Sequence, residues 1–210
     1  MPIQTAIIGA GSAGQSLLAL LRQMGQTSEQ MCFFEEDHYY QQRQQLDVVA
    51  GLPLYPLSQF DPERWQVFIA LGTPSDRARI ASQLPPETVY PSCIHPQAFL
   101  LTPYDFPAGT VIYPFVYLSR DVQLGQQVVL MTATVVGHNV SIGDFATFSG
   151  NVGIGGNSQI GKRVFCGLNS AIRHEVSLCD DITLGMGAMA TRSLKEPGVY
   201  IGNPARLLKK

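Results

Sequence analysis

Two histidines in the second half of the chain carry the side chain best suited to moving a proton at neutral pH. They are His138 and His174. Imidazole changes its charge near neutrality and is the most frequent general base in enzymes. Asn139 follows His138 directly, and an amide there can orient the ring but carries no charge that would raise its basicity. A lone exposed histidine is more often a plain solvated side chain, so the residue types alone leave both interpretations open.

A glycine-rich segment near the N-terminus has the residues to bind phosphate. An apolar, strand-like run at 3–8 is followed by the sequence Gly-Ala-Gly-Ser-Ala-Gly and then by a helix-like run. Glycines let the backbone approach a phosphate closely, and the helix N-terminus offers free N–H groups. A second apolar run ends at Glu35 and Glu36, where an acidic side chain commonly holds a ribose hydroxyl. The same loop could serve packing alone, because GxGxxG by itself is a weak signal.

The elements that position His138 are indicated by a six-residue repeat. Every sixth residue from Ile112 to Leu184 is apolar over thirteen positions, and the residue two before each is small or β-branched. Alternation along a strand puts positions two apart on one face, so each hexad supplies two inward residues and a corner. Glycine often follows the large residue, where we expect it to relieve backbone strain. Three hexads make a coil of about 18 residues, which predicts a parallel β-solenoid over 110–190.

Counting by coils predicts which residues share an edge of this solenoid. One such column contains Arg120, His138, Gly156, His174 and Arg192. The two histidines lie two coils apart, roughly 10 Å, so they cannot share a metal ion within one chain. Together with four cysteines that show no CxxC spacing, this argues against a solenoid carbonic anhydrase and predicts no metal site. The bare Gly156 predicts an open groove beside His138, although it could equally mark only a tight corner.

A separate α/β unit precedes the solenoid. We divide the chain into residues 1–95 and 96–210, the second including a closing segment at the C-terminus. A full dinucleotide-binding fold needs two βαβαβ halves, and the first segment is long enough for only one. The expected ligand is therefore a mononucleotide such as a nucleoside-diphosphate sugar, which argues against an NAD-dependent dehydrogenase.

A Rossmann-like half-domain followed by a hexapeptide solenoid resembles the bacterial nucleotide-sugar acetyltransferases. This group includes the 4-amino-sugar N-acetyltransferases and relatives associated with sialic acid O-acetylation. The resemblance is carried by the repeats VSIG at 140–143, VGIG at 152–155 and ITLG at 182–185, by the corner at His138, and by the tail at 198–206. It implies a left-handed parallel β-helix, acetyl-CoA as the co-substrate, and a homotrimer with its sites between subunits.

The resemblance also implies roles for individual residues. His138 would be the general base on the amino group of a nucleotide-linked 4-amino-4,6-dideoxy sugar, with Asn139 beside it. The substrate-binding residues would be Gly9, Gly11, Ser12, Ala13, Gly14, Glu35, Glu36, Gly72 and Thr73. The coenzyme-binding residues would be Thr147, Leu168 and Met186, to which the groove expected beside His138 adds Gly156. The chain departs from the family at Ser12-Ala13, usually Gly-His, at Asn139, often acidic, and at Thr147, a histidine in some members.

Two other functions fit the same residues: O-acetylation of a sugar hydroxyl, and a non-catalytic scaffold that binds nucleotide sugar. The residues do not identify the base, the sugar or the acyl group. A net charge of −2 with 14% charged residues gives no support to a nucleic-acid partner or an anionic membrane. No basic leader and no apolar run of about 18 residues is visible, which predicts a cytoplasmic protein without membrane insertion. Surface polysaccharide biosynthesis is the setting that the resemblance implies.

Overall fold

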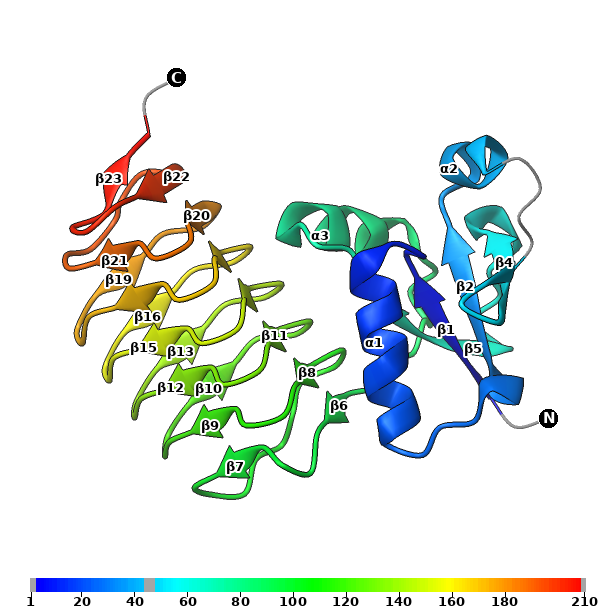
Figure 1. Ribbon diagram of the computed structural model, residues 1–210, viewed down its shortest axis with the longest axis horizontal. Helices are drawn as coiled ribbons and strands as arrows, with labels where there is room; N and C mark the ends of the chain where they lie inside the picture. Colours follow the sequence, from blue (N-terminus) through cyan, green and yellow to red (C-terminus); the bar gives the residue numbers. More distant parts are fainter. Residues whose placement is uncertain (1–2, 44–47, 209–210) are drawn as a thin grey trace. The chain divides into compact units, whose positions relative to one another are not determined.

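A computed structural model describes residues 3–43 and 48–208 of the chain. It divides into two compact units, residues 1–91 and 92–210, drawn from blue to cyan and from green to red in Figure 1. The boundary falls after Pro91, because Cys93 and Ile94 already pair with Val111 and Ile112 of the next coil. Among the described residues, no helix is long and apolar enough to cross a membrane.

The first unit is a five-stranded sheet with helices. The strand order is β3-β4-β2-β1-β5, in which β3 alone runs antiparallel to its neighbour. The strands are β1 Gln4–Ile8, β2 Met31–Glu35, β3 Val48–Val49, β4 Leu52–Pro56 and β5 Trp65–Ile69. The helices are α1 Ser12–Gln23, α2 Asp37–Gln42 and α3 Pro74–Gln83, with 3-10 turns at Ser28–Gln30 and Leu57–Gln59.

This sheet is held by strands that are apolar along nearly their whole length. β1 and β2 are buried on both faces, as is usual for parallel strands, and Phe34 packs its ring against those of Tyr55, Phe60 and Trp65. Because β1 lies between β2 and β5, the carboxyl ends of these three strands meet at one edge. That edge is where ligands bind in open parallel sheets.

The second unit is a parallel β-helix of three faces. The first face contains β6 Cys93–Ile94, β8 Val111–Ile112, β11 Val129–Leu130, β14 Thr147–Phe148, β17 Phe165–Cys166, β20 Ile182–Leu184, β22 Gly198–Ile201 and β23 Arg206–Leu207. The second contains β7 Phe99–Leu100, β9 Tyr117–Leu118, β12 Val135–Val136, β15 Gly153–Ile154, β18 Ala171–Ile172 and β21 Met189–Ala190. The third contains β10 Gln123–Leu124, β13 Ser141–Ile142, β16 Gln159–Ile160 and β19 Ser177–Leu178.

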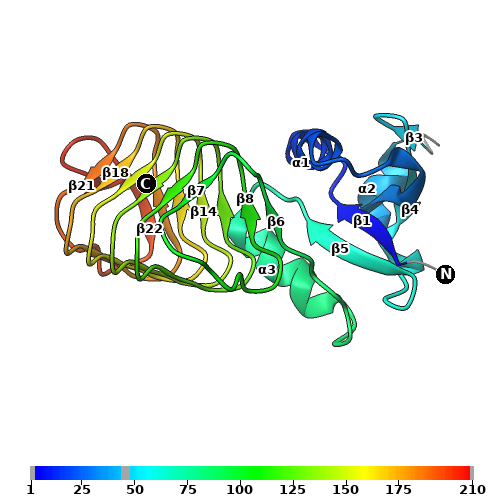
Figure 2. The same ribbon diagram turned by 90° about the horizontal axis from the view of Figure 1, so that it is seen from below.

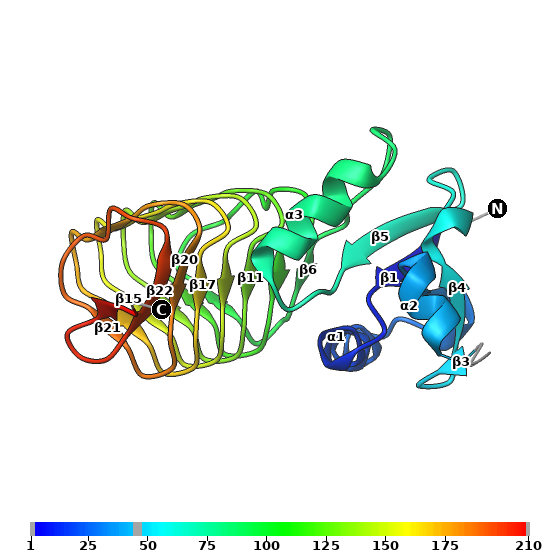
Figure 3. The same ribbon diagram turned by 90° about the horizontal axis from the view of Figure 1, so that it is seen from above.

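The register of the β-helix follows the expected count. Val129 pairs with Val111 on one side and with Thr147 on the other, so each coil consumes three hexads. The repeating large residues, such as Ile112, Leu130 and Phe148, form one buried core through the whole unit. The coils follow one another along the same path when viewed from below and from above (Figures 2 and 3).

The corner glycines have a different role from the one we expected. Gly125, Gly137 and Gly155 do not adopt positive φ angles, so they relieve no backbone strain there. A Cβ on Gly155 would instead lie 2.3 Å from the backbone nitrogen of His174 in the next coil. Close stacking of the coils therefore requires these glycines. The positive φ angles fall two positions later in each corner, often on Asn or Asp, which tolerate this conformation better than other residues with side chains.

Candidate active site

A pocket of about 470 Å³ opens at the carboxyl ends of β1, β2 and β5 in the first unit. Seven of the nine residues predicted to bind the substrate line it: Gly9, Gly11, Ser12, Ala13, Glu35, Glu36 and Gly72. Thr73 stands at the N-cap of α3 and Gly14 lies inside α1, and neither lines this pocket. The strands thus bring together three segments that are far apart in the sequence.

Each glycine of the loop meets a different steric demand. A Cβ on Gly14 would lie 1.8 Å from the carbonyl oxygen of Gly9, so this position must be glycine for α1 to pack on β1. Gly9 itself has φ +102 and faces the backbone of Ala70. Gly11 has open space around it and forms the N-cap of α1 without a side-chain hydrogen bond. The first N–H groups of the helix therefore need another partner, which suits an anion.

The two acidic residues of the pocket are both bound to arginines that the sequence did not point to. Arg43 contacts Glu35 through two nitrogens, and Nη2 donates to Oε1 at 2.8 Å. Arg79 of α3 donates to both oxygens of Glu36 at 2.8 and 2.9 Å. The hydrogen bonds from Arg79 hold the pKa of the Glu36 carboxyl below its usual value. Both carboxylates are thus held in place and keep lone pairs for a ligand hydroxyl.

Tyr39 is a further pocket residue that sequence reasoning missed. It belongs to α2, is exposed, and lines the pocket beside Glu35 and Glu36. The ring of His38 lies against it, with 3.9 Å between the ring centres. No motif marks this position, because its place depends on how α2 begins directly after β2. An exposed aromatic ring here offers a surface on which a nucleoside base can stack.

In the second unit, His138 and Asn139 occupy the corner between β12 and β13, and both are exposed. Nδ1 of His138 lies 2.8 Å from Oδ1 of Asn139. An amide oxygen only accepts hydrogen bonds, so the ring proton belongs on Nδ1 and the lone pair of the neutral ring on Nε2. Asn139 has φ +56, which brings its side chain back toward the preceding residue. The pair can therefore act as an oriented base.

The column that includes His138 is confirmed from Arg120 to His174 as one edge of the β-helix, which we call the histidine edge: Arg120, His138, Gly156 and His174. Arg192 was expected to continue it, but the register breaks in the last corner, where Leu194 pairs with Leu178. Main-chain bonds run from Asn139 N to Arg120 O and from Asn157 N to His138 O. Gly156 does not leave the open groove that we expected, because a Cβ at this position would lie 2.9 Å from Nε2 of His138. The imidazole itself fills the space that the missing side chain leaves, and glycine is needed to let the ring lie there.

Of the four residues predicted to contact the coenzyme, three fall on two different edges and one on a face. Leu168 and Met186 stack at the edge between the first and second faces, which we call the Leu168 edge, and are 44% and 78% exposed. Gly156 lies on the histidine edge, at the other side of the second face. Thr147, on the first face, is only 5% exposed, and its hydroxyl has no hydrogen-bond partner among the described residues. One chain does not bring the four together.

The histidine edge offers no constellation for a metal ion. His174 follows His138 by two coils, and the residues of this edge that lie between them include Gly156 but no further ligand. Across the described ranges, no group of three or more His, Cys, Asp and Glu side chains is arranged to hold a metal. The chemistry available at this edge is proton transfer by an imidazole.

Comparison with known protein families gives a match to the first unit. The family described as the PglD N-terminal domain matches residues 4–84, which run from β1 to the end of α3. The match therefore covers most of the N-terminal unit and none of the β-helix. The pocket at the ends of β1, β2 and β5 lies within the matched residues, whereas His138 lies outside them in the β-helix.

Relatives with known sequences match part of the chain. A UDP-3-O-acylglucosamine N-acyltransferase of Bordetella avium (strain 197N) is 35% identical over 79 residues, which are 38% of this chain and 22% of that protein. A probable mitochondrial enzyme of the same name from Arabidopsis thaliana is 40% identical over 70 residues, 33% of this chain and 23% of that protein. The chain thus spans only about a fifth of the length of these curated relatives.

Solved structures match over the whole length. The acetyltransferase domain of PglB from Neisseria gonorrhoeae FA1090 has a TM-score of 0.80 at 24% identity, covering 98% of this chain and 99% of that chain. A histidine-to-asparagine variant of perosamine N-acetyltransferase from Caulobacter crescentus, in complex with CoA and GDP-perosamine, has a TM-score of 0.87 at 20% identity, covering 100% and 99%. The expected fold, an α/β half-domain followed by a left-handed parallel β-helix, is confirmed.

Proposed function

We propose that this chain is an acetyl-CoA-dependent N-acetyltransferase that acts on the amino group of a nucleotide-linked amino sugar of the 4-amino-4,6-dideoxy type. The observation that carries the proposal is the exposed His138, with Nδ1 bound by Asn139 Oδ1 and Nε2 left as a base. Support comes from the likeness over the whole chain to a perosamine N-acetyltransferase in complex with CoA and GDP-perosamine.

The reaction needs a base but no covalent intermediate on the protein. The sugar amine attacks the thioester carbonyl carbon of acetyl-CoA and forms a tetrahedral intermediate. Nε2 of His138 accepts the proton that the amine loses, and the intermediate collapses as the carbon–sulfur bond breaks. The imidazolium then returns this proton to the leaving thiolate, so the products are the amide and free coenzyme A. An oriented base of this kind contributes about 10² to 10⁴ in rate.

The nucleotide of the substrate binds, in this proposal, in the pocket of the first unit. The free N–H groups at the start of α1 donate hydrogen bonds to a phosphate, and Glu35 and Glu36 accept hydrogen bonds from the ribose hydroxyls. The two arginine contacts keep these carboxylates aligned. The departures at Ser12 and Ala13 leave the loop without a histidine, so the phosphate contacts here come from the backbone.

The active assembly is a homotrimer in this proposal, with the second face of each β-helix turned toward the threefold axis. The outward side chains of that face form an apolar row: Phe99, Tyr117, Val135, Gly153, Ala171 and Met189. Phe99 and Val135 are 60% and 47% exposed. Because this face joins the histidine edge to the Leu168 edge, a trimer built on it brings the two edges of neighbouring chains together. The coenzyme-binding residues then come from both chains.

A cytoplasmic location and a role in surface polysaccharide synthesis complete the proposal.

Thiol release from acetyl-CoA tests this function with a panel of UDP-, GDP-, dTDP- and CMP-linked amino sugars. We expect release with an amino sugar and not with the matching sugar that bears a hydroxyl. His138→Ala should lower kcat by about 10² to 10⁴ and leave the KM for acetyl-CoA nearly unchanged. Arg120→Ala, one coil away on the same edge, is the matched control and should behave as wild type. Release only with hydroxyl acceptors, or with none, contradicts the proposal.

A further inference from the structure

The two acidic residues at the end of β2 belong to opposite faces of the sheet in the first unit. Side chains two apart along a strand share a face, so Glu35 follows Phe33 and Glu36 follows Phe34. A Cβ on Gly14 of α1 would lie 3.2 Å from the ring of Phe33. Glu35 therefore lies on the face of the sheet that α1 covers.

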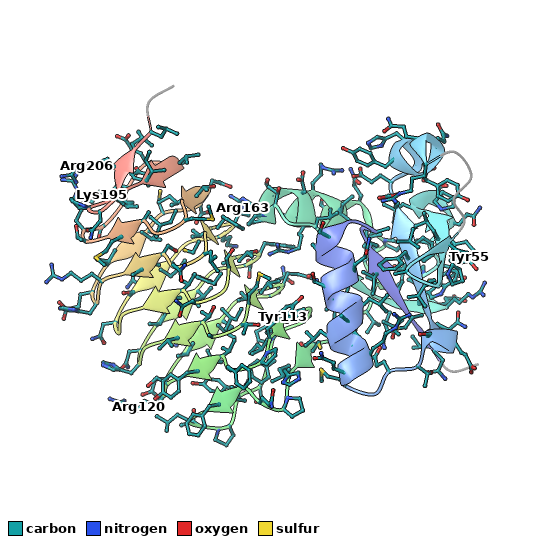
Figure 4. The ribbon with its side chains drawn as sticks, in the orientation of Figure 1. Tyr55, Tyr113, Arg120, Arg163, Lys195 and Arg206 are labelled. Atoms are coloured by element: carbon teal, nitrogen blue, oxygen red, sulfur yellow. The ribbon has the colours of Figure 1, made fainter. Side chains whose placement is uncertain are left out.

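Glu36 lies on the other face, which α3 covers. Phe34 shares a core with Ile80 of α3, and the ring of Tyr55, labelled in Figure 4, packs against Phe34. Arg79, the residue before Ile80, donates to both carboxylate oxygens of Glu36. A nucleotide at this edge of the sheet therefore meets one acidic side chain from each face.

These positions match the order of the groups along a nucleotide. A 5′-phosphate at the N-terminus of α1 is joined through C5′ and C4′ to C3′, so the 3′-hydroxyl lies nearer to it along the ribose than the 2′-hydroxyl. Glu35, on the α1 side, suits the 3′-hydroxyl, and Glu36 suits the 2′-hydroxyl. Tyr39 follows Glu36 by three residues and lines the same pocket, where the base is attached to the carbon next to C2′.

The carboxylate of Glu36 is held by Arg79 and not by its own helix. Glu36 is the N-cap residue of α2, where an acidic side chain can accept from the free N–H groups of the helix, but it makes no such bond. Arg79 binds both of its oxygens, at 2.8 and 2.9 Å, whereas Asp76 of α3 stays 3.9 Å from Arg79. Because Ile80 is completely buried, α3 cannot rotate to carry Arg79 away without exposing an apolar side chain.

A fixed carboxylate selects its ligand more strictly than a mobile one. When the ligand lacks the hydroxyl, a mobile carboxylate turns toward water, whereas a fixed one keeps lone pairs that nothing satisfies. We propose that Arg79 is the residue that makes this site select a ribonucleotide over a 2′-deoxyribonucleotide, acting through Glu36; this rests on the proposed nucleotide-sugar function. The substrate is then a sugar linked to a ribonucleotide, whatever its base, and not to dTDP.

Calorimetric titration with UDP, GDP and CMP, each beside its 2′-deoxy counterpart, isolates the 2′-hydroxyl. For the base that binds, the Kd of the 2′-deoxynucleotide should exceed that of the ribonucleotide about tenfold or more in wild type. In Arg79→Gln the Kd of the ribonucleotide should rise about tenfold, and that of the 2′-deoxynucleotide should stay within about twofold. The ratio of the two constants therefore falls toward one. At an ionic strength of about 0.15 M, charges more than about 8 Å apart are largely screened, which limits any general effect of the lost charge.

Three further variants separate positioning from charge. Arg79→Lys keeps the charge but not the paired N–H groups, so its ribonucleotide Kd should stay raised by about threefold. Arg43→Gln releases Glu35 on the opposite face; it should keep the wild-type ratio for the 2′-deoxy probe and lower the ratio for a 3′-deoxy probe. Arg22→Gln, at the far end of α1 from the pocket, removes an arginine bound to Ser28 and should change no Kd.

A double variant shows whether Arg79 acts through Glu36. Glu36→Ala with Arg79→Gln should bind the ribonucleotide no more weakly than Glu36→Ala alone, because the arginine has lost the group that it positions. In turnover, Arg79→Gln should raise the KM for the nucleotide sugar about tenfold and leave kcat and the KM for acetyl-CoA within about twofold. The midpoint of urea unfolding should hardly move, since partly exposed ion pairs add little stability.

Four results would overturn the role of Arg79: an unchanged ratio in Arg79→Gln, full recovery in Arg79→Lys, additive losses in the double variant, or a wild type that binds only dTDP or no nucleotide. Thiol release with a ribonucleotide-linked amino sugar and an unchanged ratio would leave the proposed function intact and remove only this role. Nucleotide binding with the expected ratios but no thiol release with any amino sugar would do the reverse.

Discussion

The contact between His138 and Asn139 defines which ring nitrogen is free. An aspartate at the second position would both orient the ring and stabilise the imidazolium, whereas the amide of Asn139 only orients it. The chain therefore has an oriented base without a carboxylate beside it. This is better matched to an amine, which is already a good nucleophile, than to a hydroxyl.

Replacing Asn139 by aspartate should separate orientation from charge. In Asn139→Asp the new carboxylate favours the protonated ring. The acidic limb of the profile of kcat/KM against pH should therefore move to higher pH by about one pH unit. At pH 6 the variant should be slower than wild type, and on the alkaline plateau it should be at least as fast. The pH–rate profile is the measurement.

The variant should fold normally, because aspartate tolerates the positive φ of this corner nearly as well as asparagine. Asn157→Asp, at the equivalent corner one coil later, is the matched control and should leave the profile in place. A profile that does not move in Asn139→Asp would show that His138 is not the titrating base.

The buried hydroxyl of Thr147 is expected to lower the stability of the folded chain. Because Oγ1 has no partner among the described residues, Thr147→Val should raise the free energy of unfolding by about 1 kcal/mol. Thr110→Val is the control: its hydroxyl donates to Pro107 O at 2.6 Å, and its loss should destabilise by about the same amount. Urea unfolding of both variants measures the difference. A destabilised Thr147→Val would mean that the hydroxyl is hydrogen-bonded.

Some residue-level features follow from the sequence and others do not. His138 could be located by counting along the repeat, and the acidic end of β2 by the motif. The arginines that bind these acids could not, because Arg79 is far from Glu36 along the chain and meets it only through the packing of α3. Likewise, the contact between the ring of His138 and Gly156 depends on the side-chain rotamer of His138, which the spacing of residues in the sequence does not determine.

At the scale of elements, the repeat predicted the strands and their register for two reasons. Inward and outward side chains alternate within each hexad, and each strand pairs with the strand three hexads away. The reason for the corner glycines was wrong, since strain and close stacking select the same residue and only the structure tells them apart. The ending of the last coil was not predictable either. The shortened corner there breaks the period on which the prediction rests.

The loop between β1 and α1 allows packing to be separated from binding. In Gly14→Ala the new methyl meets the Gly9 carbonyl, and the free energy of unfolding should fall by about 3 kcal/mol. In Gly11→Ala it meets open space, and stability should stay within about 0.5 kcal/mol of wild type. Because Gly11 lines the pocket, its variant should nevertheless bind nucleotide more weakly. Urea unfolding and nucleotide titration measure these effects; equal stability of the two variants would contradict this account of Gly14.

For the whole molecule, the apolar second face predicts how copies assemble. Val135→Glu places a charge in the middle of the row and should convert a trimer into monomers, because a buried unpaired carboxylate costs several kcal/mol. Gln159→Glu, on the polar third face, is the control and should remain trimeric. Sedimentation or size exclusion measures this, with thiol release in parallel. A monomeric wild type, or a trimeric Val135→Glu, would contradict the assembly.

The regular period of the coils makes the length of the β-helix an adjustable quantity. Removing one of the coils between His138 and the C-terminal end, residue for residue in register, would re-form each inter-coil hydrogen bond with the next coil along. The base would then stand one strand spacing, about 4.8 Å, closer to the C-terminal end of the β-helix. The distance between His138 and any group at that end would thus change by insertion or deletion of whole coils rather than by substitution.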